Sequence, residues 1–235
     1  MVRDTRKTLM DYQESTESEN EFCYEGINFK IKADSNNPLE VSIIDNFKKE
    51  AELQSALEYS DPNKKFHPEG SLGVHIEQCL NYCDRMSKLY HNWERDRKIL
   101  RPAVMMHDLC KLHEAYLGGK HPRLVLEMDE ILYGIGDDEF HKLLLHHDDH
   151  YKFYRRRNNK GIGRIFKKEF MGFTQTQLEV LVRFGYADRY RKKPKDQIEL
   201  ENYHRIKRQY CNEMEWFIAM AKKTSLLTPN FRAFS

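Results

Sequence analysis

The feature that most constrains this chain of 235 residues is the segment VMMHDLCK, in which a histidine and an aspartate follow an apolar run. His107 and Asp108 stand directly after a valine and two methionines, and Lys111 comes three residues after Asp108. A carboxylate that enters an apolar core is costly unless a positive charge lies beside it. The segment therefore predicts either an ion pair or a metal ion inside the core.

The composition favours a globular protein that can form a substantial core. Apolar residues make up 40% of the chain, and 39 Lys and Arg nearly balance 37 Asp and Glu. The length suits one substantial domain with an appendage, or two small domains. Five irregularly spaced cysteines favour reduced, buried thiols over a disulfide framework. With neither a secretory signal nor a membrane-spanning apolar run visible, we expect a cytoplasmic protein without membrane contact.

The periodicity predicts an all-α fold with a small N-terminal extension. Within residues 1–60, INFKIKA alternates apolar and polar residues as a strand does and DSNNP is typical of a turn, so a small β-hairpin is expected. Residues 61–225 have the spacing of helices, and residues 226–235 form a C-terminal tail. Helices are expected at 74–93, from near Pro102 to 116, and at 121–135, 137–151, 174–193 and 197–223, with Thr174 as an N-cap.

Side chains that can bind a metal recur along these helices, each flanked by apolar residues that would turn it into a bundle. They are His75, His107, Asp108, His121, His146, His147 and Asp188. A single histidine on an apolar face is more often a packed, hydrogen-bonded core residue. Burying the whole set without a cation would be destabilising, however. Imidazole and carboxylate ligands suit Fe, Mn, Ni, Co or Zn, so we expect one or two divalent transition metals.

We also expect these ligands to divide between two ions. We expect His75, His107 and Asp188 to hold one ion, with Asp108 as a bridge, because a carboxylate has two oxygens. The second ion would be held by His121 together with either His146 or His147. Two ions roughly 3.5–4 Å apart can stabilise both the attacking and the leaving oxygen of a displacement.

Taken in order, these residues resemble the HD-domain superfamily of metal-dependent phosphohydrolases. HDLCK is similar to the His-Asp-x-Gly-Lys element of that superfamily, with Cys110 in the glycine position. HPEGSLGVH, residues 67–75, is similar to the start of the HD domain of bacterial tRNA nucleotidyltransferases. KHPRLVLEMDEIL and LLLHHDDHY resemble the segments that complete a two-metal site in dinuclear members. The resemblance spans roughly residues 65–225 and implies an HD-type helical bundle over residues 61–225.

The resemblance also implies an activity. The expected enzyme is a phosphomonoesterase or phosphodiesterase that uses a metal-activated water, with Asp108 and Lys111 as catalytic residues. Lys111 would either neutralise charge on a phosphoryl oxygen or pair with a ligand carboxylate. Some members of the superfamily use a di-iron version of this ligand set to activate oxygen, so a di-iron oxygenase is the alternative. A nucleic-acid-binding module with a structural metal is a third interpretation.

Two basic stretches follow the candidate ligands. YKFYRRRNNKGIGRIFKKEF interleaves aromatic residues with lysines and arginines, and RYRKKPK comes directly after Asp188. Guanidinium groups bind phosphate through two parallel hydrogen bonds, and aromatic side chains suit base stacking. Either stretch alone is typical of a solvated loop, but two beside one site favour a phosphate-containing substrate, either a nucleotide or a nucleic-acid end. The substrate-binding candidates are His67, Arg155, Arg156, Arg157, Arg189 and Arg191.

Overall fold

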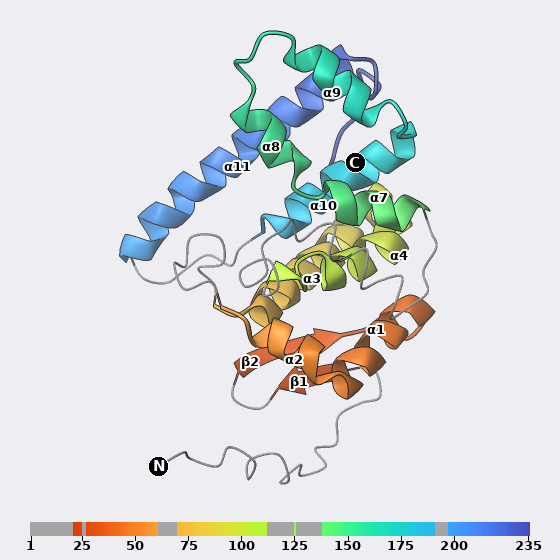
Figure 1. Ribbon diagram of the computed structural model, residues 1–235, viewed down its shortest axis with the longest axis vertical. Coiled ribbons are helices and arrows are strands. Elements are labelled where there is room, and N and C mark those ends of the chain that lie inside the picture. The colour runs from red at the N-terminus through yellow and green to blue at the C-terminus, as the bar shows by residue number, and fades with distance from the viewer. Residues whose placement is uncertain (1–20, 25–26, 61–69, 112–124, 126–137, 191–196) are drawn as a thin grey trace.

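A computed structural model describes residues 21–24, 27–60, 70–111, 125, 138–190 and 197–235. The described chain is mostly helical and carries one two-stranded antiparallel sheet near its N-terminal end. The predicted all-α class with a small hairpin is therefore confirmed. The molecule is elongated, with the hairpin at one end and helices α8 (Asp149–Arg155) and α9 (Ile162–Phe170) at the other (Figure 1).

The hairpin pairs strand β1 (Glu21–Tyr24) with strand β2 (Ile27–Lys32). Phe22 lies opposite Ile31 in this register, and both side chains are buried. On the other face, Lys30 and Lys32 form ion pairs with Glu21 at 2.5 and 3.3 Å. This alternation is the pattern that predicted a strand at INFKIK.

Two helices that the sequence pattern did not predict follow the hairpin: α1 (Pro38–Lys49) and α2 (Ala51–Glu58). The side chain of Asn37 accepts a hydrogen bond from the backbone N–H of Leu39, and Pro38 occupies the first turn, where proline is tolerated. Ile43, Ile44 and Phe47 then recur at helical spacing and are fully buried. The expectation that helices begin only after residue 60 is therefore wrong.

The N-terminal extension shares its core with the helical bundle. Ile31 and Phe47 belong to the same buried cluster as Ile76 of helix α3 (Leu72–Leu89). A buried guanidinium also joins the two parts, because Arg101 lies 3.0 Å from a carboxylate oxygen of Glu40. The same side chain donates to the carbonyl oxygen of Lys32 at 2.6 Å. The division of the chain near residue 60 stays a prediction.

Helix α4 spans His91–Met106, so the predicted start near Pro102 is wrong. Pro102 lies inside the helix and is buried. Trp93 and Leu100, also on α4, are fully buried, and this packing outweighs the hydrogen bond that proline removes. The chain leaves the helix after Met106 and turns through residues 107–110, although the sequence predicts that the helix continues there.

The C-terminal half agrees better with the sequence. Helix α10 (Gln175–Asp188) begins at the predicted N-cap Thr174, which forms a capping box with Gln177. Helix α11 (Gln197–Lys223) has the predicted bounds. The helix predicted at 137–151 is instead two helices, α7 (Asp138–His146) and α8, separated by a short turn. The helix predicted at 121–135 lies outside the described residues except for Val125.

The last ten residues, 226–235, pack back on the bundle. Leu227, Phe231 and Ala233 are buried, and the indole nitrogen of Trp93 donates to the carbonyl oxygen of Ala233 at 2.9 Å. Across the described ranges, no helix is both long enough and apolar enough to cross a membrane.

Candidate metal centre

Four candidate ligands from three separate parts of the chain meet inside the bundle. His75 comes from α3, His107 and Asp108 come from the turn after α4, and Asp188 ends α10. Each offers one ligand atom, and these atoms all lie within 4.8 Å of one another. All four residues are buried. The convergence that the sequence predicts for them is therefore present.

The distances between the donor atoms fit a shared cation. His107 Nε2 lies 3.0 Å from Asp188 Oδ1 and 3.1 Å from Asp108 Oδ2, and His75 Nε2 lies 3.3 Å from Asp188 Oδ1. Ligand atoms bound to one ion at about 2.1 Å are about 3.0 Å apart in octahedral and about 3.4 Å apart in tetrahedral geometry. Two imidazole nitrogens and two carboxylates are also the donor types that divalent transition metals prefer. These four residues could hold a metal ion.

The His107 imidazole is oriented by the backbone. Its Nδ1–H donates to the carbonyl oxygen of Val104 at 2.9 Å, which leaves Nε2 as the nitrogen that faces the two carboxylates. His147 repeats this arrangement, because its Nδ1–H donates to the carbonyl oxygen of Leu144 at 2.7 Å. Both histidines directly follow the end of a helix, and both bond the carbonyl three residues earlier. Histidines that ligate metals commonly have such a partner on the second ring nitrogen.

The electrostatics of the cluster favour a bound cation. Burial opposes a charged imidazole, but Asp108 and Asp188 outweigh it and raise the pKa of His107 to about 9. Burial likewise opposes a charged carboxylate, yet Arg189, His107 and His75 hold the pKa of Asp188 well below its usual value. Asp188 thus retains its negative charge, and its contact with His107, together with that of Asp108, favours a proton on the imidazole. A divalent metal can replace that proton, so we expect metal binding to release protons.

Lys111 lies at the rim of this cluster. Its ammonium nitrogen is 2.5 Å from Asp108 Oδ2, and its side chain is 22% exposed while that of Asp108 is 1% exposed. Burial alone would lower the pKa of Lys111, but Asp108 raises it above its usual value. The ion pair with a ligand carboxylate, one of the two predicted roles of Lys111, is present.

The structure separates the two neighbouring histidines that the sequence leaves as alternatives. His147 is buried, and its Nε2 lies 3.7 Å from Asp108 Oδ1, the second oxygen of the predicted bridging carboxylate. His146 belongs instead to a group with Asp149 and Glu169, where its Nδ1 is 2.6 Å from Asp149 Oδ2. His147 is therefore the one placed beside the cluster. His121, the other predicted ligand of a second ion, lies outside the described residues.

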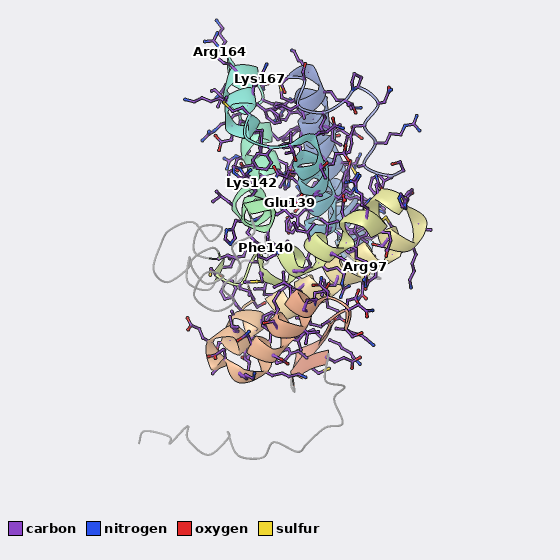
Figure 2. All side chains as sticks on the ribbon, turned by 90° about the vertical axis from the view of Figure 1, so that its right-hand side faces the viewer. Arg97, Glu139, Phe140, Lys142, Arg164 and Lys167 are labelled. Carbon is purple, nitrogen blue, oxygen red and sulfur yellow. The ribbon has the colours of Figure 1, made fainter. Side chains whose placement is uncertain are left out.

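The predicted substrate-binding arginines lie in two different places. Residues 155–157 are exposed around the end of α8, and their hydrogen bonds are local, such as that from Arg157 to the carbonyl oxygen of Tyr154 at 3.0 Å. The basic run continues on α9, where Arg164 and Lys167 lie at the end of the molecule opposite the hairpin (Figure 2). Arg189 is next to the cluster. His67 and Arg191 lie outside the described residues.

Arg189 connects the cluster to residues that sequence reasoning did not select. Its Nε lies 3.6 Å from Asp188 Oδ2 and donates to His150 Nε2 at 3.0 Å, while Nη2 is 3.6 Å from Asp148 Oδ1. Burial and the charge of Arg189 lower the pKa of His150 to about 3, so this imidazole is neutral and can accept the hydrogen bond.

Cys79 is another residue beside the cluster that sequence reasoning did not select. Its Sγ lies 3.6 Å from His75 Nε2, and its spacing of four residues from His75 on the same helix is the signal that could have identified it.

Comparison of the chain with family models, with curated proteins and with solved structures found no match. Any function assigned to the cluster therefore depends on the residues of this chain alone.

Proposed function

We propose that this chain is an HD-type metal-dependent phosphohydrolase that acts on the phosphate of a nucleotide or of a nucleic-acid end. The observation that carries the proposal is the convergence of His75, His107, Asp108 and Asp188 on one buried point. The chain order of these residues resembles that of the superfamily. The donor distances also fit a single ion.

Each side chain of the cluster has a role in this proposal. His75, His107 and Asp188 would hold the first ion, Asp108 would bridge, and His147 would contribute to a second ion. A bound divalent metal of this kind polarises a phosphoryl oxygen and lowers the pKa of a water molecule towards neutrality. The neutral His150 holds Arg189 in place against Asp188 and Asp148.

Lys111 is a cation beside the cluster that a substrate would contact. Its ammonium group is partly exposed, whereas the carboxylate it contacts is not. An ammonium group in this position would neutralise the charge that develops on a phosphoryl oxygen during attack by water. Its existing ion pair holds it in place before the substrate arrives.

The test combines metal content with phosphate release. The protein, loaded in turn with Mn²⁺, Co²⁺, Ni²⁺, Zn²⁺ or Fe²⁺, is offered phosphomonoesters, cyclic nucleotides and short oligonucleotides. We expect phosphate or nucleotide release with at least one metal, and loss of both metal and activity in Asp108→Asn. Asp45→Asn, an acid on α1 outside the cluster, provides the matched control.

The alternative makes a different prediction in the same experiment. A di-iron oxygenase would retain two irons with a characteristic visible spectrum and release no phosphate from any of these compounds. That result would overturn the phosphohydrolase proposal and favour the oxygenase.

A further inference from the structure

A cavity of about 320 Å³ lies beside the metal centre, between α3, α10, α11 and the C-terminal tail. Figure 1 shows α11 running along α8 and α10. Tyr203 and Tyr210 of α11 line the cavity together with Arg189 and Tyr190, which directly follow α10. Aromatic side chains dominate the walls, and they include Tyr82, Tyr190, Tyr203 and Tyr210. The volume is at the lower end of the range of roughly 300–1,000 Å³ that is usual for small-molecule sites.

The other prominent feature of the walls is positive charge. Arg85, Arg189 and Lys207 line the cavity, and no aspartate or glutamate is found among its described lining residues. Tyrosine and arginine are layered: Tyr82 stacks on Tyr190 with ring centroids 4.6 Å apart, and the guanidinium of Arg85 lies over both rings. The guanidinium of Arg189 lies 5.0 Å from the ring centroid of Tyr210.

We propose that this cavity binds a single nucleotide, with the base among the tyrosines and the phosphate on the cationic side chains. Aromatic faces stack bases with little regard to sequence, and guanidinium groups bind phosphate oxygens in pairs. A cavity this small suits a mononucleotide rather than an oligonucleotide. The absence of described acids in the walls removes the repulsion that a phosphate would otherwise meet.

Arg189 sets the direction in which the nucleotide lies. It lines the cavity, and its Nε is also 3.6 Å from Asp188 Oδ2 at the metal centre. A phosphate bound by Arg189 is therefore at the edge of the cavity nearest the cluster. That orientation places the phosphate towards the hydrolytic site and rests on the proposed function, whereas binding in the cavity does not.

The test measures binding of adenosine 5′-monophosphate to metal-free protein in the presence of a chelator, by isothermal titration. Adenosine, ribose 5-phosphate and inorganic phosphate serve as partial ligands. We expect the nucleotide to bind at least about tenfold more tightly than any of the three, because each lacks either the stacking or the charged contacts. Binding no tighter than that of inorganic phosphate would overturn the proposal.

The variants remove charge without touching the metal ligands. In Arg85→Gln/Lys207→Gln we expect nucleotide binding to weaken at least about tenfold. Lys88→Gln/Arg208→Gln is the matched control, since it makes the same charge change on the same two helices outside the cavity. Both pairs are exposed, so folding is not at risk. If both double variants weaken nucleotide binding equally, net charge explains the loss and the proposed site is overturned. If neither weakens it, Arg85 and Lys207 do not bind the nucleotide and the proposed site is also overturned.

A stacking variant and an activity assay complete the experiment. Tyr203→Leu should weaken nucleotide binding by about tenfold while it leaves inorganic phosphate unaffected. If nucleotide binding fails while the protein still binds metal and releases phosphate from other esters, the pocket proposal falls and the proposed function stands. If the nucleotide binds but no ester is hydrolysed with any metal, the proposed function falls and the pocket stands.

Discussion

We predict that the metal-free protein loses stability at alkaline pH, because His107 gives up its proton there. The imidazole is fully buried, and its contacts with Asp108 and Asp188 raise its pKa from 6.5 to about 9. A group whose pKa is raised on folding stabilises the folded state below its unfolded pKa, and this contribution disappears as the pH rises through the folded pKa. A difference of about 2.5 pH units at 1.36 kcal/mol each corresponds to about 3 kcal/mol.

The assay is urea unfolding of chelator-treated protein at several pH values from 6 to 9.5. We expect the free energy of unfolding of the wild type to fall by about 3 kcal/mol more than that of His107→Gln over this range. His91→Gln, which changes an exposed histidine at the start of α4, should follow the wild type. Parallel curves for wild type and His107→Gln would refute the assignment of a charged His107 to the metal-free cluster.

Three further outcomes follow from the contacts. Glu40→Ala should destabilise the protein by about 1.5–3 kcal/mol in urea unfolding, because the buried Arg101 guanidinium loses its charged hydrogen bonds to Glu40 and keeps Asp84, at 2.7 Å, as its remaining carboxylate. His147→Gln should lower the number of bound metal ions or the affinity for the second ion, whereas His146→Gln should not, as followed by elemental analysis. Replacement of residues 155–157 by glutamine should raise KM more than it lowers kcat, since these arginines are expected to bind substrate rather than act in chemistry.

Each of these outcomes has a clear contradiction. A change below about 1 kcal/mol in Glu40→Ala would mean that the Arg101 pair contributes little to joining the hairpin to the bundle. Loss of metal in His146→Gln but not in His147→Gln would reverse the choice between the two histidines. A pure decrease in kcat for the arginine variant would contradict a substrate-binding role.

Local sequence signals predicted the elements whose ends are fixed by local chemistry. Thr174 and Gln177 form the capping box that begins α10, and this signal lies within four residues of sequence. The strand INFKIK likewise follows from the alternation of residues in one short segment. These predictions succeed because the pattern that determines each element lies within a few residues of sequence.

The failures arise where tertiary packing decides. A proline such as Pro102 is usual in the first turn of a helix, but here it lies inside α4, whose residues Trp93 and Leu100 are buried before it. The helices after Asn37 escape prediction because the short apolar set of Ile43, Ile44 and Phe47 resembles either a buried helix or a strand.

For the candidate site, too, the sequence predicted some residues and not others. The sequence order was sufficient to select His75, His107, Asp108 and Asp188, which meet although they come from separate elements. It could not separate His146 from His147, because that choice depends on where α7 ends and on which ring the turn directs towards Asp108. The sequence also could not predict the cavity lined by tyrosines, because its walls come from separate segments and no local pattern specifies their contacts.

The central claim is that distant side chains form one metal-binding point, and Co²⁺ binding tests it most directly. After equilibration and gel filtration, elemental analysis gives the number of ions per chain and the visible spectrum reports imidazole and carboxylate ligands. We predict at least one retained Co²⁺ in the wild type and in Asp45→Asn, and none at this site in His107→Gln or Asp188→Asn. Retention of the same number of ions with the same spectrum in both cluster variants would contradict the account.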